Sequence, residues 1–260
     1  MKAAATVVTT ALGMRASMPS AERFRDACKR GDLPGVARNF NVAYAEQKDA
    51  NGNLIMNTIC QSGHLRVAQY LCEKGIPADR EDEQGLRPIH FACLGGKLDV
   101  ARWLHEQRCR LDCRSSNGGQ PIHTACHKGH LDVAMWLQEQ GVELDAATHN
   151  GLRPIHLACQ GGHLQMAQWL HVEGAALDVS NDAGWQPIHF ASVKGQVDVI
   201  RWLHSQGIRL DTPNTEGKLP RDLALSSSST KLVNWIDAQV RVRVRVWVWV
   251  RARVRARVIV

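Results

Sequence analysis

The fold of this chain is decided by the stretch Gly85-Leu86-Arg87-Pro88-Ile89-His90-Phe91-Ala92-Cys93, because variants of it return three more times. The glycines that open the four copies are 33 residues apart: Gly85, Gly118, Gly151 and Gly184. Two further ladders keep the same period, one of glycines from Gly63 to Gly195 and one of aspartates from Asp79 to Asp211. A shared period of this kind indicates an array of similar units, each packed against its neighbours.

Each unit is predicted to contain two short helices and an extended finger. Pro88 and its equivalents suit the first turn of a helix, because the fixed φ of proline fits there and its missing N–H is not needed. A second segment places Leu131, Ala134 and Leu137 on one face of a second helix. The run that ends in Asn150-Gly151 closes with a turn pair, as a hairpin does.

These residues resemble the ankyrin repeat, whose unit carries Gly-x-Thr-Pro-Leu-His-x-Ala-Ala followed by Gly-His-Leu. The resemblance covers residues 21–239. It implies an all-α repeat solenoid of helix-turn-helix units with β-hairpin fingers, in which the fingers and the first helices line a concave groove. End units of such arrays are atypical because one face of each meets water. The expected boundaries are an N-terminal cap over 21–49, repeats over 50–214 with a degraded unit over 50–82, and a C-terminal cap over 215–239 with a last helix near Lys231–Gln239.

The net charge of +7 belongs to one tail. Residues 240–260 contain seven arginines and no acid, so residues 1–239 carry a formal charge of zero. This tail alternates Arg or Trp with Val or Ala until its end. The alternation predicts either a strand with a cationic face for anionic membrane or nucleic acid, or a translated low-complexity repeat without selected function. Residues 1–20, which also lack acids, predict a disordered tail or an organelle-targeting segment.

The chain departs from the family pattern at the place before the proline, where the family has a Thr that caps the first helix. The residues found there are Arg87, Gln120, Arg153 and Gln186. Two interpretations stay open: solvated side chains at tolerant positions, or a row of donors for a partner's carboxylates or carbonyls.

Aromatic residues fall into two groups. Four tryptophans share the 33-residue period and are interpreted as core between units: Trp103, Trp136, Trp169 and Trp202. Trp185 instead lies just after a finger glycine. It is either an anchor for a partner or a cover for a neighbouring finger.

Five of the eight cysteines occupy one equivalent place in successive units, where the family prefers Ala: Cys28, Cys60, Cys93, Cys126 and Cys159. A buried small apolar side chain explains them. This use of cysteine favours a reducing compartment, and the cytoplasm is predicted.

Most of the twelve histidines recur with the repeat. The one crowded set comprises His123, Cys126, His127 and His130, which zinc could use. His123 and Cys126 already have places in the repeat, so no metal is predicted. No nucleophile, base and orienting group stand apart from the repeat, and no phosphate-binding Gly-rich loop is present. We therefore predict a protein that is not an enzyme and has no cofactor.

The predicted function is a non-catalytic scaffold, monomeric, that binds a partner protein through the concave groove. The resemblance implies the binding role, and the fold does not name the partner. The alternative is a repeat platform brought to anionic membrane or nucleic acid by the Arg-rich tail. The residues predicted to contact the partner are Leu86, Arg87, Leu94, His127, Lys128, His149, Leu152, Arg153, Trp185, Gln186 and Lys194.

Overall fold

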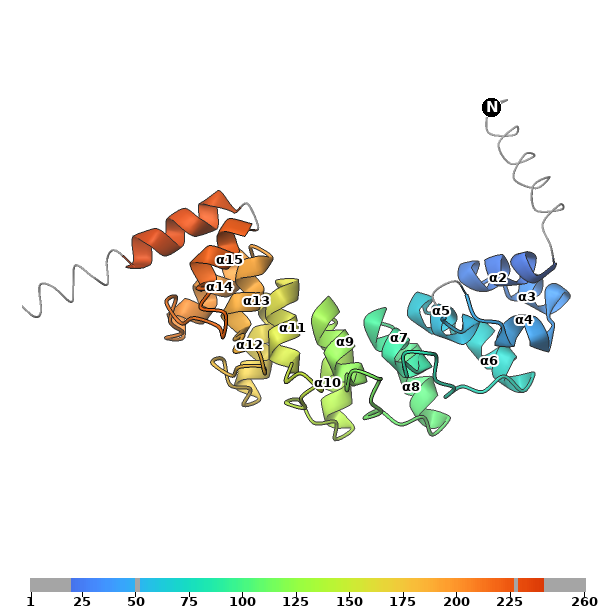
Figure 1. Cartoon of the computed structure of the whole chain (residues 1–260). Helices are drawn as coiled ribbons and strands as arrows, with labels where there is room; N and C mark the ends of the chain where they lie inside the picture. Colours follow the sequence, from blue (N-terminus) through green and yellow to red (C-terminus); the bar gives the residue numbers. More distant parts are fainter. Residues whose placement is uncertain (1–19, 50–51, 227–228, 241–260) are drawn as a thin grey trace, which may run out of the picture. The chain divides into compact units, whose positions relative to one another are not determined.

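The computed structural model of the chain describes residues 20–49, 52–226 and 229–240 (Figure 1). Apart from Ser20 and Val240, which lie in helices, the two predicted tails fall outside the described residues. The described residues form helices and loops, which confirms the predicted helical repeat fold. None of the described helices combines the length and apolarity that a membrane crossing requires.

The chain divides into two compact units. The first contains the residues up to Ala125 together with Asp132–Val142, and the second contains Cys126–Leu131 and the residues from Glu143 onward. The helices before the boundary are α2 (Ser20–Arg30), α3 (Leu33–Asn39), α4 (Val42–Glu46), α5 (Ile55–Ser62), α6 (Leu65–Glu73), α7 (Pro88–Leu94) and α8 (Leu98–Glu106). The boundary passes through α9 (Pro121–Lys128) and α10 (Leu131–Glu139). The second unit continues with α11 (Pro154–Gly161), α12 (Leu164–Val172), α13 (Pro187–Val193), α14 (Val197–Ser205), α15 (Pro220–Ser226) and a last helix over 230–240.

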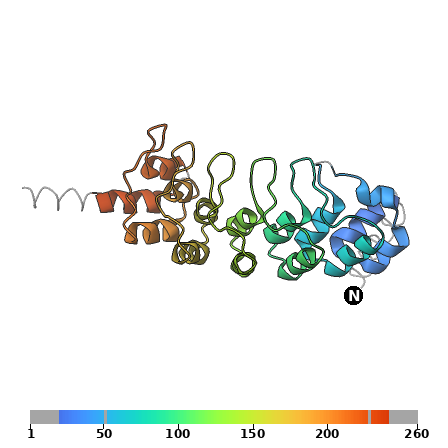
Figure 2. The ribbon, with the colours of Figure 1, turned by 90° about the horizontal axis from the view of Figure 1, so that it is seen from below.

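Helices pack in register with the repeat. In the first unit α5 lies beside α7, and in the second α11 lies beside α13, which in turn lies beside α15. Each of these is the first helix of a pair, and the second helix follows it closely, as α12 follows α11 and α14 follows α13 (Figures 1 and 2).

Local sequence explains where the first helices begin and end. Pro154 opens α11, and the residue before it, Arg153, is extended with φ −112° and ψ 160°. A residue that precedes proline is driven to this region, because its α conformation clashes with the proline ring. Gly162 ends α11 with φ 77°, and its N–H donates to the carbonyls of Ala158 and Cys159. A left-handed residue at this place is favourable for glycine alone among common residues.

The core is a repeated set of small and branched side chains. The first helices bury Ile, Ala and Cys or Ser, as in Ile155, Ala158 and Cys159, which are at most 1% exposed. The second helices bury an apolar triplet such as Val199, Ile200 and Leu203. The five periodic cysteines are fully buried, as predicted.

The predicted β-hairpin fingers are not confirmed, because the described residues contain no strand. The loops between helix pairs project from one side of each unit (Figure 2) and are closed by two backbone bonds at the tip. In one finger the Thr148 N–H donates to the Leu152 carbonyl (2.9 Å) and the Gly151 N–H to the Thr148 carbonyl (3.0 Å). Side-chain bonds complete the turn, since the Leu152 N–H also donates to Thr148 Oγ1 (3.0 Å). The tight turn is present without a ladder long enough to make a strand.

Gly95 provides a test of how closely the first helices approach. A Cβ at this position would lie 2.1 Å from the Gln61 carbonyl oxygen at the end of α5, where only backbone movement relieves the clash. We expect Gly95→Ala to lower the free energy of unfolding by about 1–3 kcal/mol. Lys194→Ala, at the equivalent and exposed position of α13, is the control and should change it by less than about 0.5 kcal/mol. Urea unfolding of both variants measures this, and equal stability of the two would contradict the close approach.

Candidate functional site

The Arg and Gln ladder before the prolines braces the fingers. Each of the four side chains reaches back eight residues and donates to the carbonyl of a periodic aspartate: Arg87 to Asp79 (3.2 Å), Gln120 to Asp112 (3.1 Å), Arg153 to Asp145 (3.3 Å) and Gln186 to Asp178 (2.9 Å). The structure adds a third role to the two predicted interpretations, because at least one donor of each side chain is used within the chain. The bond ties the start of each first helix to the other side of its own finger.

The arginines of this ladder also form ion pairs. Arg87 Nη1 lies 2.7 Å from Asp79 Oδ2 and its Nη2 lies 3.2 Å from Glu81, while Arg153 pairs with Asp145. These side chains are about one-third exposed, so the pairs contribute little to stability by themselves. Their importance here is that Arg87 and Arg153, both predicted to contact a partner, already have acidic neighbours.

A second ladder, of histidines, caps the first helices. Nδ1 of each histidine accepts the N–H of the residue before the proline: His90 from Arg87 (3.1 Å), His123 from Gln120 (3.2 Å), His156 from Arg153 (3.0 Å) and His189 from Gln186 (3.0 Å). This bond satisfies the N–H of the residue before the proline. It is a different bond from the one that the family's Thr hydroxyl would make, because that hydroxyl would accept an N–H of the first turn, and Arg87, Arg153 and Gln186 make no such side-chain cap.

The other ring nitrogen of the same histidines joins successive repeats. Nε2 of His156 donates to the Val179 carbonyl (3.0 Å), and Nε2 of His189 donates to the Thr212 carbonyl (2.9 Å). Because Nδ1 accepts a backbone N–H, the proton of the neutral ring must be on Nε2. Burial lowers the pKa of His90 and His156 to about 4, so both rings are neutral at pH 7.

Two members of the set that zinc could use, His123 and Cys126, make other contacts. His123 Nδ1 serves the cap of α9, and Cys126 Sγ lies 3.7 Å from Met166 Sδ in the core. Among the residues that the structure describes, no group of three potential metal ligands comes together.

The cysteines are poor nucleophiles. Burial raises the pKa of the Cys28, Cys109 and Cys113 thiols to about 12, and burial also raises that of Cys126 and Cys159. A thiol reacts as its thiolate, so these groups are unreactive at neutral pH.

Trp185 packs on the first helix of its own repeat. Its ring centroid lies 5.3 Å from that of Phe190 and 6.2 Å from that of His189, and Phe190 in turn contacts the buried His156 of α11 at 5.4 Å. Trp185 and Phe190 are both half-buried. These contacts hold the Trp185 ring against α13, and its two predicted roles, a partner anchor or a cover for a neighbouring finger, both stay predictions. Trp185 forms with Phe190 a fixed aromatic pair at the base of the finger.

Phe190 is a surface residue that the sequence interpretation missed. The detectable pattern is its place five residues after Trp185, across the start of α13. Leu152 and Leu157 hold the same two places in the α11 repeat, and both are half-buried. We call the surface formed by Leu152, Leu157, Trp185, Phe190 and Lys194 the α11–α13 surface.

The remaining predicted residues differ in exposure and position. Lys128, His149 and Lys194 are exposed, whereas Leu86, Leu94 and His127 are half-buried. Leu86, Arg87 and Leu94 belong to the first unit, and the other eight belong to the second. The second unit thus contains the α11–α13 surface and most of the predicted residues.

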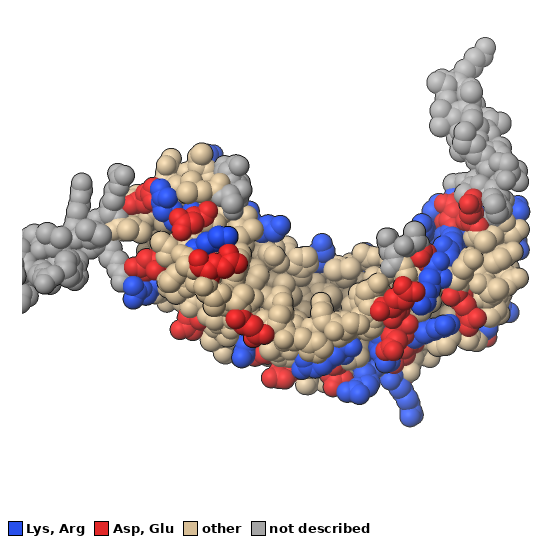
Figure 3. Space-filling model, viewed as in Figure 1, with Lys and Arg blue, Asp and Glu red and all other residues tan. Residues whose placement is uncertain are grey.

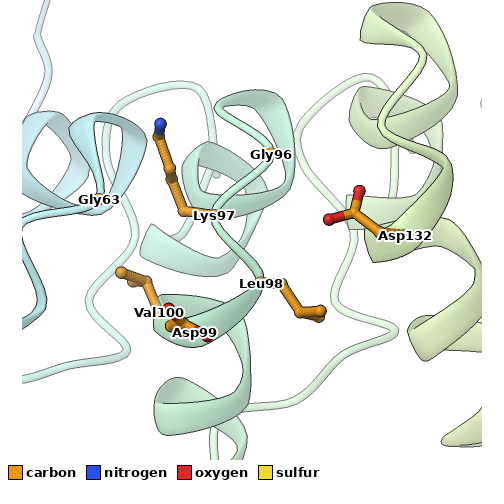
Figure 4. Close-up of a pocket in the computed structure, with 7 residues that line it drawn as sticks. All are labelled: Gly63, Gly96, Lys97, Leu98, Asp99, Val100 and Asp132. Carbon is orange, nitrogen blue, oxygen red and sulfur yellow. The ribbon is translucent and has the colours of Figure 1, made fainter.

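A hollow of about 340 Å³ in the first unit lies elsewhere, at the start of the second helices. Its lining residues are Gly63, Gly96, Lys97, Leu98, Asp99, Val100 and Asp132 (Figure 4). Lys97 extends past Gly63, while Leu98 and Asp132 face each other from neighbouring helices. Asp99 and Asp132 are in the first turns of α8 and α10, where the helix dipole stabilises a carboxylate. This explains both acids without a ligand.

Charges on the described surface are mixed. Figure 3 shows acidic and basic side chains interleaved on the face in view. Several are paired between successive fingers of the first unit, including Lys48 with Glu83 (2.9 Å) and Arg80 with Glu46 (3.4 Å). The face in view, among the described residues, shows no broad basic patch of the kind that binds a nucleic-acid backbone (Figure 3).

Comparison with known families gives two matches. A model described as ankyrin repeats (many copies) matches residues 93–138 and 122–171, and one described as ankyrin repeats (3 copies) matches residues 24–115 and 160–243. Together these matches extend from residue 24 to residue 243. No curated protein matches the chain significantly.

Proposed function

The chain belongs to the ankyrin repeat family, whose members are generally protein–protein interaction modules, and from this premise we propose that it binds a partner protein through the α11–α13 surface. In this proposal the chain is a non-catalytic scaffold. Residues 21–239 form its repeat domain, with caps over 21–49 and 215–239.

The observation that carries the proposal is the Trp185–Phe190 pair. Two large aromatic side chains of this repeat remain half-buried, while Ile188, Ala191, Val199 and Leu203 of the same repeat are buried. Their ring centroids lie 5.3 Å apart, with Phe190 on α13 and Trp185 just before the helix, whose start is fixed by the His189 cap. Rigid aromatic side chains lose little conformational entropy on binding, and residues of this type dominate binding energies at protein interfaces.

The Arg/Gln and His ladders support the same proposal, because their side chains bond within the chain and are less available to a partner. The Arg, Gln and His side chains near the finger bases are engaged within the chain, so they serve the scaffold. Lys128 and Lys194, by contrast, are exposed and form no ion pair among the described residues. The reducing compartment and the monomeric state stay predictions, and the alternative role of the Arg-rich tail concerns residues outside the described ones.

Trp185→Ala tests the proposed surface. Full-length protein is used to capture partners from a lysate of its native cells, and the captured proteins are quantified by mass spectrometry. We expect the variant to retain a specific partner at least about tenfold less well, because the aromatic anchor is removed.

Arg153→Gln is the control, in the preceding finger of the same unit. Gln occupies the equivalent places 120 and 186 and keeps the bond to the finger carbonyl. This variant should capture the same proteins as the unaltered chain. If Trp185→Ala also captures the same proteins, while circular dichroism shows both variants folded, the α11–α13 surface is not the binding surface.

A further inference from the structure

We propose that the α11–α13 surface, extended by Lys128, recognises an acidic peptide segment that also presents a large apolar side chain. This inference rests on the proposed function and names the chemistry of the partner. It is carried by an aromatic pair and two unpaired lysines that lie on the same edge of the second unit.

The apolar part and the charged part share one helix face. Phe190 and Lys194 are four residues apart, so they lie on the same side of α13, and the helix rise separates them by about 6 Å along its axis. Trp185, which packs against Phe190, precedes the start of α13, whereas Lys194 follows its end. A bound segment would therefore place its apolar side chain near Trp185 and Phe190 and its carboxylate one helical turn away.

The lysines lack the partners that the arginines have. Lys128 and Lys194 are exposed, and neither forms an ion pair among the described residues, whereas Arg87 and Arg153 do. The equivalent place in the repeat between them is Gly161, which has no side chain. Two helix spacings separate the lysines, roughly 16–20 Å. An extended segment of about five or six residues spans that distance.

Two histidines, His127 and His163, lie beside Lys128. The Nε2 atom of His163 lies 3.0 Å from the His127 carbonyl, which fixes the last turn of α9 against the start of α12. Burial lowers the pKa of His127, and the positive charges of Lys128, His163 and Lys194 lower it further.

Charge also indicates what does not occupy this surface. The helices α9, α11 and α13 contain no Asp or Glu, so the surface has no acid of its own along these helices. Residues 1–19 and 241–260 contain no acid either, and their Lys and Arg would be repelled. An acidic bound segment would supply the complementary charge along these helices. Two lysines are few for a nucleic-acid backbone, which carries one charge per nucleotide, and this favours a peptide.

The test selects peptide ligands from random sequences, so the identity of the natural partner need not be known. A phage library of random 12-residue peptides is selected on the full-length chain, and enriched peptides are synthesised with a fluorescent label for anisotropy titrations. We expect the enriched peptides to carry net negative charge and an aromatic or large aliphatic residue. Peptides that are neutral or basic, or a failure to enrich any peptide, would overturn the inference.

Charge reversal supplies the decisive comparison. Lys128→Glu/Lys194→Glu should weaken binding of the selected peptides at least about tenfold. The matched control is Lys29→Glu/Lys231→Glu, which reverses two exposed lysines elsewhere in the chain. Both double variants have the same net charge, and both keep the Arg-rich tail. The control should change affinity less than about twofold. Equal weakening by the two double variants would overturn the inference.

Peptide binding by Trp185→Ala and a titration with a second ligand separate the possible failures. If Trp185→Ala weakens peptide binding but the Lys128/Lys194 reversal does not, the binding surface stands and its acidic preference is wrong. If neither change matters, the proposed function also fails. A labelled oligothymidylate is titrated in parallel: binding that is lost in Lys128→Glu/Lys194→Glu and kept in the control would assign the lysines to nucleic acid and overturn the peptide assignment.

Discussion

Lowering the pH from 7 to 5 should destabilise each compact unit by about 2 kcal/mol through one buried histidine, His90 in the first and His156 in the second. Burial holds the pKa of both at about 4, below the ordinary value of 6.5. Between these values the unfolded chain binds more protons than the folded chain. Stability is therefore complete above about pH 6.5 and is lost as the pH falls toward 4.

Urea unfolding at a series of pH values measures this effect. The double variant His90→Gln/His156→Gln removes both titrating rings, so its stability should change much less between pH 7 and pH 5, although it is lower throughout. If the unaltered chain is equally stable at both pH values, the two rings are not held neutral in the folded state by burial. The same result in the double variant as in the unaltered chain would assign the pH dependence to other groups.

His156→Ala should be among the most damaging single changes in the chain, with a loss of about 3–5 kcal/mol. The ring is fully buried, packs against Phe190, accepts the Arg153 N–H and donates to the Val179 carbonyl. Alanine leaves a cavity and two unsatisfied backbone groups in place of these contacts. Hydrogen exchange should show the loss of protection in the second unit, around α11 and α13.

His149→Ala is the control for this change. His149 is exposed at a finger tip, so its removal should alter stability by less than about 0.5 kcal/mol. Comparable losses in the two variants would show that the buried ring contributes no more than a surface side chain. That outcome would contradict the role of the histidine ladder.

Much of the fold was predictable because its determinants recur in every repeat. Pro88, Pro121, Pro154 and Pro187 begin helices as predicted, and the periodic cysteines are buried. The family also follows from the repeat. The β-hairpin was not confirmed because a turn such as Thr148–Leu152 needs only two backbone bonds, and the sequence cannot show how far pairing continues beyond it.

The site was less predictable, because the same residue types serve either the scaffold or a ligand. Arg153 and Lys194 are both basic residues near the start or end of a first helix, yet one is paired with Asp145 and the other is exposed without an ion pair. One pattern was available, since the Arg or Gln ladder lies eight residues after the aspartate ladder in every strong repeat. The pairing of Trp185 with Phe190 depends on the rotation of α13 against its finger, which sequence spacing does not fix.

The most direct test of the central claim is site-specific photo-crosslinking of the full chain in its native cells. A benzoylphenylalanine replaces Phe190 in one protein and Val172 in another, because Val172 is an apolar residue of the same unit that is 80% exposed at the end of α12. We expect a partner protein to be crosslinked at position 190 and not at position 172. Crosslinks to the same partner only at position 172 would place binding on the second helices and contradict binding at the α11–α13 surface.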